Sequence, residues 1–484
     1  MKRFLAVAPA LLLLAGCDLA PTYHRPGLPA PASLPSGGTY PATTTGTTAA
    51  ADIAWQDFFV DPALRQVVGM GLANNRDLRV ALANIEQARA QYRVQRADLL
   101  PTIAANGSAT WQHGAGGLGS TSTGGTTGGP VVGNGRGTTD IYSVTAGLSA
   151  FEIDLFGRVR NLTRAALEQY LATEEGARAT RISLIAEIAS AYLTMAADQD
   201  QLRISRGTLE SFRQSYELTQ AQFRIGVTSE LEVRQAQTNY EQARYDIAAL
   251  QTQIARDQNA LNLLVGTTVT ADLLPAELGD RPYTLAALPA GVSSDVLLQR
   301  PDVAQAEHQL VAQYANIGAA RAAFFPQISL TAVAGTLSTS LSGLFDHGSG
   351  TWTVAPSASQ TIFDFGRNAA NLRYAKASRD AALATYERAI QTAFREVADA
   401  LAERGTIAEQ LAARSDRVAA AQTAFTLSDA RYKAGVDPFL TTLDAQRTLY
   451  AAQQNLVQTR LDAASNLIEL YRALGGGLRS KAEQ

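Results

Sequence analysis

Phe156-Gly157-Arg158 returns 209 residues later as Phe365-Gly366-Arg367, and this repetition decides the expected fold. The same offset joins three further pairs: Gly226-Val227 with Gly435-Val436, Ala236-Gln237 with Ala445-Gln446, and Gly266 with Gly475. An offset that stays constant from residue 156 to residue 266 indicates two copies of one structural half, because solenoid repeats are far shorter.

A second recurrence, upstream of the first, has a larger offset. Arg96–Pro101 returns as Arg321–Pro326, 225 residues later. The first copy therefore contains 16 extra residues between Pro101 and Phe156. That interval holds the Gly/Thr/Ser-rich stretch 114–139, whose composition predicts a long surface loop.

Two stretches without proline predict long helices, at residues 131–274 and 357–437. Apolar side chains between Ile185 and Phe223 recur in alternating steps of three and four, which is typical of coiled-coil packing. A helix from about residue 158 to residue 224 would be roughly 100 Å long at 1.5 Å per residue.

Each copy is therefore expected to form a long helical hairpin, at 157–265 and at 366–474. Gly226 and Gly435 are suited to end the first helix of each hairpin, because glycine readily adopts the left-handed conformation at a helix C-terminus. Pro438 is expected as the first residue of a returning helix, where its missing N–H is not needed.

Four shorter segments alternate apolar with small polar residues, at about 102–111, 140–153, 327–337 and 351–363. This alternation predicts strands, and it fits both a membrane barrel and a soluble sheet with one wet face. No segment after Cys17 has 18 consecutive apolar residues, so crossing a membrane would require strands. Four strands cannot close a barrel, which takes at least about eight, so several chains would have to share one.

The first residues form a secretion signal with a lipid-attachment site. Lys2-Arg3 precede the apolar run Phe4–Leu14, which is too short to span a membrane. Leu14-Ala15-Gly16-Cys17 is similar to a bacterial lipobox, in which the cysteine thiol is acylated. Cys17 is the only cysteine of the chain, which favours lipidation over an incidental cysteine.

Composition excludes several function classes. The 484 residues are 46% apolar and 18% charged, with a net charge of −3, which fits neither a disordered chain nor a nucleic-acid binder. One cysteine cannot form a disulfide within the chain, and the histidines are too far apart in sequence for a ligand set. We therefore expect no metal, no enzymatic activity and no cofactor other than a covalent lipid on Cys17.

The expected organisation is a mainly α chain with duplicated helix–strand–strand–helix–helix halves. Its parts are a signal peptide (1–16), a lipid-anchored N-terminal linker (17–62), a first structural repeat (63–275), an inter-repeat linker (276–294), a second structural repeat (295–477) and a C-terminal tail (478–484).

Ordered segments along nearly the whole mature chain resemble outer-membrane factors of the OprM/NodT kind, the TolC-like lipoproteins of tripartite efflux systems. These segments are Trp55–Leu64, Asn75–Leu78, Leu297–Val303 with Ala306-Glu307, Ile362–Arg367, Arg431–Val436, Leu443–Arg447 and Ala473–Gly477. The long Gly-rich loop departs from the family pattern.

The resemblance implies a homotrimer in which each chain gives four strands to a twelve-stranded outer-membrane β-barrel, continued by a long periplasmic α-helical (coiled-coil) barrel. It implies a passive, gated exit duct of an RND-type multidrug or small-molecule efflux system in a Gram-negative bacterium. Such a duct docks onto a periplasmic adaptor (membrane fusion) protein and an inner-membrane transporter. A type I protein or peptide secretion channel shares the fold, and a periplasmic coiled-coil tether without a pore is a third reading.

Leu440, Asp444 and Arg447 follow the second tip at i, i+4 and i+7, so they share one helix face. From spacing alone, Asp444 and Arg447 are more often an ordinary surface pair. The resemblance instead implies a periplasmic gate in which three Asp444 carboxylates crowd around the axis and Arg447 offsets their repulsion. The first-repeat gate equivalents are Leu231, Gln235 and Thr238.

The two hairpin tips are the expected adaptor-docking sites. The alternative is that their glycines serve only turn chemistry, and both roles are compatible. The tip residues are Arg224, Gly226 and Val227 in the first copy and Lys433, Gly435 and Val436 in the second.

Overall fold

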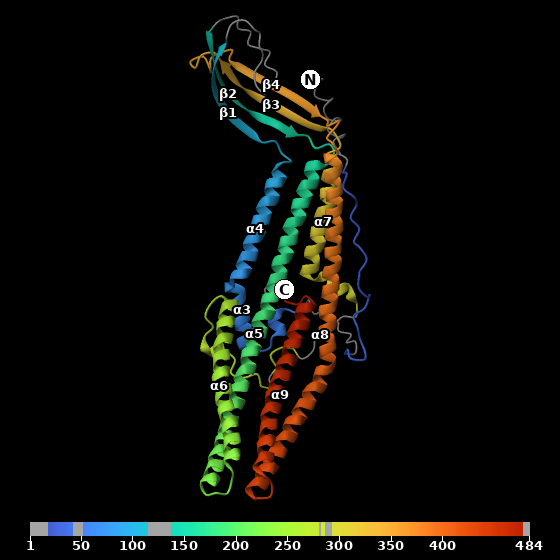
Figure 1. Ribbon diagram of the computed structural model, residues 1–484. Helices are drawn as coiled ribbons and strands as arrows, with labels where there is room; N and C mark the ends of the chain where they lie inside the picture. The colour runs from blue at the N-terminus through green and yellow to red at the C-terminus, as the bar shows by residue number, and fades with distance from the viewer. Residues whose placement is uncertain (1–17, 42–51, 115–136, 280–281, 286–292, 478–484) are drawn as a thin grey trace. The chain divides into compact units, whose positions relative to one another are not determined.

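The computed structural model describes residues 18–41, 52–114, 137–279, 282–285 and 293–477 (Figure 1). Cys17, the expected lipidation site, lies outside the described residues, as does most of the loop 114–139. Among the helices of the described ranges, none is long and apolar enough to cross a membrane.

Secondary structure repeats the order helix, strand, strand, helix, helix, which confirms the expected duplication. The first half contains α4 (Arg76–Ala97), β1 (Ile103–Gly114), β2 (Gly137–Glu152), α5 (Arg158–Arg224) and α6 (Glu230–Val265). The second half contains α7 (Pro301–Ala322), β3 (Gln327–Ser338), β4 (Gly350–Ser359), α8 (Arg367–Lys433) and α9 (Phe439–Ala473). The helices α2 (Trp55–Phe58) and α3 (Pro62–Asn74) precede the first half. The helices α5 and α8 have 67 residues each.

The chain divides into two compact units, which are described separately. The first unit combines residues 88–170 and 310–381 with the start of the chain, and it contains the four strands. The second unit combines residues 25–87, 171–309 and 382–484, and it contains the tips of both hairpins.

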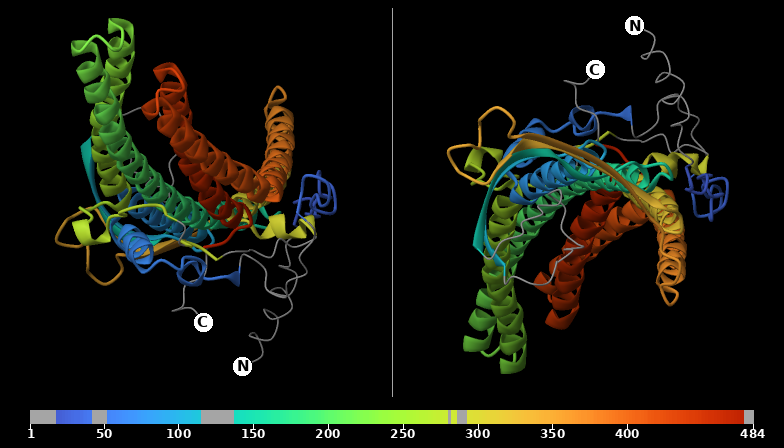
Figure 2. Two further views of the ribbon diagram at one scale, coloured as in Figure 1. Left: turned by 90° about the horizontal axis from the view of Figure 1, so that it is seen from below. Right: turned by 90° about the horizontal axis from the view of Figure 1, so that it is seen from above.

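The four strands form one curved antiparallel sheet in the order β1-β2-β3-β4 (Figure 2). Register places directly opposed residues on the same face. One face is mainly apolar, whereas the opposite face carries Asn106, Ser108, Thr110, Ser143 and Thr145. The apolar face holds Ile103, Trp111, Tyr142, Val144, Trp352 and Val354, most of them exposed. Neither β1 nor β4 has a strand partner on its outer edge among the described residues.

Three strand limits differ from the sequence expectation by three residues or more. The first strand continues to Gly114, three residues past its expected end, and the second begins at Gly137, three residues before its expected start. The fourth strand ends at Ser359 instead of 363. The chain leaves the sheet early because Asp364 begins a helix: its carboxylate accepts hydrogen bonds from the backbone N–H groups of Gly366 and Asn368. Phe365 has a φ of 55°, which an extended strand cannot contain.

Pro356 lies inside β4, although proline cannot donate to a strand ladder. Leu337 N–H bonds to Ser349 O, and hydrogen-bonded pairs alternate along an antiparallel ladder. The Leu330–Pro356 pair is therefore a non-hydrogen-bonded pair, so the Pro356 nitrogen faces away from β3. Proline is tolerated because it sits on an edge strand of this sheet.

The second unit has a dense apolar core around the ends of the helices. Gly71 of α3 contacts Ile188 of α5 so closely that an added Cβ would lie 2.2 Å from Ile188 Cδ1. Asn75 ends α3 and begins α4: its side chain accepts from Leu78 N–H and donates to Leu264 O of α6. This contact explains why Asn75 starts one of the recognisable segments.

Arg300, in the recognisable segment Leu297–Val303, joins three helices. Its guanidinium pairs with Asp302 at the start of α7 and with Glu396 of α8, and it donates to Ala473 O at the end of α9. The side chain is almost fully buried, and its charge is balanced by the two carboxylates. One buried cation therefore joins the C-terminal end of α9 to α8 and to the start of α7.

Both hairpin tips use a left-handed glycine, as expected. Gly226 has a φ of 76° and Gly435 a φ of 73°, and the residue after each donates its N–H to the carbonyl oxygen five residues back along the chain. That pattern is a Schellman motif. Pro438 does not begin α9 as expected: its ψ of 152° is extended, so it precedes Phe439, the first helical residue.

Candidate functional site

The expected gate residues lie on one exposed face at the start of α9. Leu440, Asp444 and Arg447 are all exposed, whereas Leu443 and Gln446 on the adjoining face are buried. The shared face therefore forms as the helical spacing requires.

Asp444 and Arg447 form a loose ion pair within the chain. Arg447 Nη1 lies 3.9 Å from Asp444 Oδ1, and the side chains are 63% and 66% exposed. A pair with this geometry in water contributes at most about 1 kcal/mol. Within one chain, both side chains are therefore available to groups outside it.

The first-repeat equivalents lie on the matching part of α6. Leu231 is exposed, and Gln235 is partly buried. Thr238 Oγ1 donates to the backbone oxygen of Arg234, so this hydroxyl is already satisfied within its own helix. The first repeat thus presents an apolar side chain where the second presents both Leu440 and a charged pair.

The tip turn between α8 and α9 carries an ion pair that sequence reasoning missed. Arg431 donates to both Asp437 carboxylate oxygens, at 2.6 and 2.8 Å, and so braces the turn around Gly435. The Arg431 hydrogen bond is the main cause that holds the pKa of Asp437 below its ordinary value. Lys433, one of the expected docking residues, pairs with Asp429 one helical turn away.

Apolar side chains of the tips remain exposed. The first tip presents Ile225 and Val227, and the second presents Val436. Arg224 is also exposed. Both tips therefore combine a rigid glycine turn with a small apolar surface.

The two hairpins contact one another beside the gate residues. Phe439 and Leu443 of α9 pack against Ala236 of α6, and Tyr216 and Tyr432 cover this cluster. Gate-face residues and packing residues thus alternate along the same turns of α9, so a shift of the packing would move the gate face.

Three hydrogen-bonded groups also join the two hairpins, and we call them the inter-hairpin hydrogen bonds. Tyr432 Oη donates to Gln222 Oε1 at 2.5 Å, and Gln446 Nε2 donates to Ser211 Oγ at 2.6 Å. The third group is centred on Tyr450 and is described next. Sequence reasoning missed these residues. A signal was present, because steps of four, three and four place Gln446 and Tyr450 in the same core positions as Phe439 and Leu443, where polar groups are unusual.

Tyr450 connects α9 to both helices of the first hairpin. Its hydroxyl donates to Asp246 Oδ2 at 2.9 Å, so the Ser205 hydroxyl, 2.8 Å away, is the donor in the second bond. Burial and then the Asp246 hydrogen bond raise the pKa of Tyr450 to about 12, against the lowering effect of Ser205. Tyr450 therefore stays neutral and keeps its proton at physiological pH.

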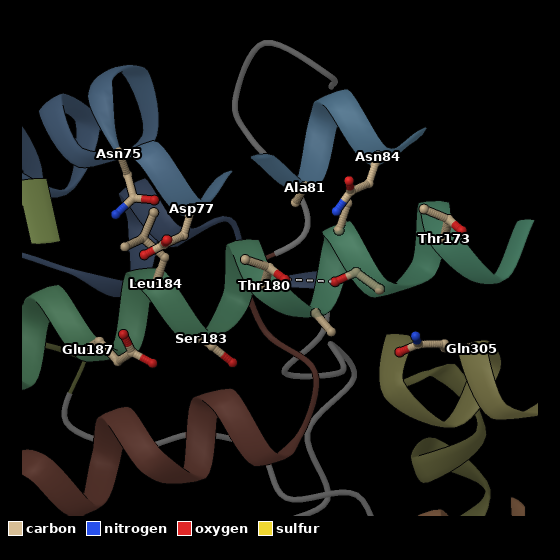
Figure 3. Close-up of a pocket in the computed structure, with 13 residues that line it drawn as sticks. Asn75, Asp77, Ala81, Asn84, Thr173, Thr180, Ser183, Leu184, Glu187 and Gln305 are labelled. Atoms are coloured by element: carbon tan, nitrogen blue, oxygen red, sulfur yellow. Dashed lines mark hydrogen bonds between the residues drawn. The ribbon is translucent and has the colours of Figure 1, made fainter. Parts of the chain in front are cut away.

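A polar pocket of about 580 Å³ lies in the second unit between α4, α5 and α7 (Figure 3). Its labelled polar side chains are amides, hydroxyls and two carboxylates, Asp77 and Glu187, and the labelled Ala81 and Leu184 are apolar. Thr180 Oγ1 donates to Gly176 O, so this hydroxyl is occupied within α5. Within the described ranges, no group of three or more His, Cys, Asp or Glu residues is placed to hold a metal ion.

Comparisons with known proteins agree over most of the chain. The family described as "Outer membrane efflux protein" matches residues 67–267 and 292–476. The toluene efflux pump outer membrane protein TtgC of Pseudomonas putida is 46% identical over 477 residues, which is 98% of this chain and 96% of that protein. The outer membrane protein OprJ of Pseudomonas aeruginosa is 43% identical over 467 residues, which is 96% of this chain and 94% of that protein.

Solved structures give the same result. A membrane protein of Pseudomonas aeruginosa has a TM-score of 0.86 at 42% identity, covering 95% of this chain and 98% of its own. The open state of the Neisseria gonorrhoeae MtrE outer membrane channel has a TM-score of 0.83 at 38% identity, covering 96% and 99%. The chain therefore belongs to the outer membrane efflux protein family.

Proposed function

We propose that this protein is the outer-membrane exit duct of an RND-type tripartite efflux system that expels antibiotics, organic solvents or similar small molecules. Membership of the outer membrane efflux protein family supports this function. Relatives named as toluene and antibiotic efflux components, at 46% identity, support the substrate class. The duct performs no chemistry, and transport is driven by its partners.

The observation that carries the proposal is the four-stranded sheet, which has one apolar face and two edges without a strand partner among the described residues. An exposed face with Trp111, Trp352 and Val354 is stable in lipid, and unpaired strand edges are not. Three copies, each pairing its β1 with β4 of the next, would give a twelve-stranded barrel without edges. The Pro356 nitrogen would then fall on the junction between copies.

In the trimer, the α9 face of Leu440, Asp444 and Arg447 would line the periplasmic end of the helical barrel. Three like charges close to the axis repel one another and favour cations, and Arg447 reduces this repulsion. Leu231, Gln235 and Thr238 would narrow the same level without adding charge. The loose Asp444–Arg447 pair supports this role, since neither group is committed within its own chain.

Opening would separate the second hairpin from the first, because the inter-hairpin hydrogen bonds lie directly behind the gate face. The exposed tips, with Val227 and Val436, would dock onto a periplasmic adaptor that connects the duct to an inner-membrane transporter. Acylation of Cys17 would anchor each chain in outer-membrane lipid.

Single-channel conductance in planar bilayers tests the proposal, with the wild-type trimer compared to Asp444→Ala and Arg447→Ala. We expect small, mostly closed events in the wild type and larger or longer openings in both variants. Glu241→Ala is the matched control, because Glu241 and Arg244 form an exposed i,i+3 pair on α6. Conductance equal in all four proteins would reject the gate, and a trimer without conductance in any form would reject the duct.

A further inference from the structure

Two carboxyl groups face each other across the first hairpin, far from its tip. Asp198 lies 26 residues before the end of α5, and Asp257 lies 27 residues after the start of α6, so they stand at the same level of the hairpin. Together with burial, the hydrogen bond and the charge of Asp257 act on the Asp198 carboxyl and raise its pKa. Neither residue belongs to the gate face or to the inter-hairpin hydrogen bonds.

Asp257 is buried and only half satisfied. Asp257 is 9% exposed, and its Oδ1 accepts a hydrogen bond from Gln253 Nε2 at 2.8 Å. Its second oxygen, Oδ2, is fully buried and receives no hydrogen bond from the described residues. A buried carboxylate oxygen without a donor is costly, because desolvation is not compensated. Oδ2 therefore requires a donor that the ionised pair cannot provide.

Charged groups on the surrounding elements do not act as that donor. They are Arg65 on α3, Asp200 and Arg203 on α5, Arg256 on α6, and Asp272 and Glu277 in the segment after α6. Arg203 pairs with Asp200 and approaches Glu277, and Asp200 also accepts from Gly279 N–H. Arg203 is thus committed to other acids, and no cation of the described residues donates to Asp257 Oδ2.

A proton held between the two carboxyls supplies the donor that the ionised pair lacks. Protonated Asp198 becomes a donor, and the pair then carries one negative charge instead of two. Burial first, and then the hydrogen bond and charge of Asp257, raise the pKa of Asp198 to about 7. This is the environment in which two carboxyls share one proton near neutral pH.

We propose that Asp198 and Asp257 form a proton-binding site that joins α5 to α6 when it is occupied. The proposal goes beyond the duct function and does not depend on the gate. Because the periplasm follows the external pH, the Asp198–Asp257 pair would hold α5 and α6 together in mildly acidic surroundings. In alkaline surroundings the pair would lose its proton and no longer hold the two helices together.

The sign of the effect follows from the direction of the shift. Between the ordinary Asp value of 3.8 and the raised value near 7, the folded protein binds more protons than the unfolded chain. The contribution of the pair to stability is therefore greatest at acidic pH and decreases as the pH rises through this window. Carboxylates with lowered pKa values, such as Asp437, have the opposite dependence at lower pH.

The test is the thermal unfolding midpoint of the full-length protein in detergent at about pH 5.5 and about pH 8. We expect the wild-type unfolding midpoint to be lower at the higher of these two pH values. Asp198→Asn should remove most of that fall, because its amide donates to Asp257 at both pH values. Asp272→Asn, an exposed change of the same kind, is the control and should behave as wild type.

A second readout does not depend on how the variants fold. Difference infrared spectra of the wild type between the same two pH values should show loss of one protonated carboxyl band, which is absent in Asp198→Asn. A wild-type midpoint that falls no more than that of Asp198→Asn would overturn the proposal. So would a rise of the wild-type midpoint at about pH 8 on adding CaCl₂ alone, since a divalent cation would then be the occupant.

Discussion

Tyr450→Phe removes one hydroxyl and leaves the ring, so it tests the connection between the hairpins with little change in packing. The ring packs edge-on against Phe212, with centroids 6.3 Å apart, and phenylalanine retains that contact. The hydroxyl alone reaches Ser205 on α5 and Asp246 on α6. Its removal therefore weakens the attachment of α9 to both helices of the first hairpin.

The expected magnitude follows from the two hydrogen bonds that are lost. A hydrogen bond to a charged group contributes about 1.5–3 kcal/mol, and a neutral one about 0.5–1.5 kcal/mol. Asp246 keeps a donor in Gln242, and its freed oxygen can be hydrated once the hairpins separate, so about 2 kcal/mol per chain is a reasonable value. That energy corresponds to a shift of about 30-fold in the equilibrium between joined and separated hairpins.

The assay is open probability in planar bilayers, with trimer content checked on the same preparation. Tyr245→Phe is the control, because Tyr245 is on α6 near Asp246 but is 68% exposed. We expect the open probability of Tyr450→Phe to rise at least about tenfold, while Tyr245→Phe stays at the wild-type value. Unchanged gating in an intact Tyr450→Phe trimer, or the same change in the control, would show that these hydrogen bonds do not hold the duct shut.

Two further substitutions test the packing of the second unit. Arg300→Met removes the hydrogen bonds to Asp302, Glu396 and Ala473 O, although Glu396 keeps Arg472 at 3.3 Å, and should cost about 1.5–3 kcal/mol, seen as a fall in the unfolding midpoint. Arg244→Met, which removes an exposed pair, should change the midpoint little. Gly405→Ala would place a Cβ 1.9 Å from Thr39 O, so the N-terminal segment should leave α8 and be cleaved faster in limited proteolysis. Gly207→Ala, with open space around its Cβ, should be cleaved as wild type, and equal rates in both variants would contradict the contact.

Sequence periodicity predicts most of this fold because the helices are long and because each copy gives independent evidence for the elements of the other. Two copies with a constant offset place Gly226 and Gly435 at equivalent turns, and both adopt the left-handed conformation. Strand limits are predicted less well, since alternation continues to about residue 363, past Ser359, where β4 ends. Local pattern carries no information on such a change of direction.

The shared face of the proposed gate residues is predicted by helical spacing, and their role as a gate is implied by the family resemblance, whereas the contacts behind this face are not predicted. Leu440, Asp444 and Arg447 share a face by geometry alone. The partners of Tyr450 come from residues more than 200 positions away in the chain, and one sequence does not show which helices become neighbours. The same holds for Asp198 and Asp257, which are separated by almost a complete hairpin.

The central claim, that several copies share one barrel, is tested most directly by crosslinking β1 to β4 between chains in outer membranes. Cys17 is the only natural cysteine, so introduced cysteines are readily followed. Ala109→Cys on β1, combined in turn with cysteine at Trp352, Val354 or Ala358 on the same face of β4, should give disulfide-linked dimers and trimers. Ala109→Cys with Ala334→Cys on the central strand β3 should give none. Only monomers from every β1–β4 combination would contradict a shared barrel.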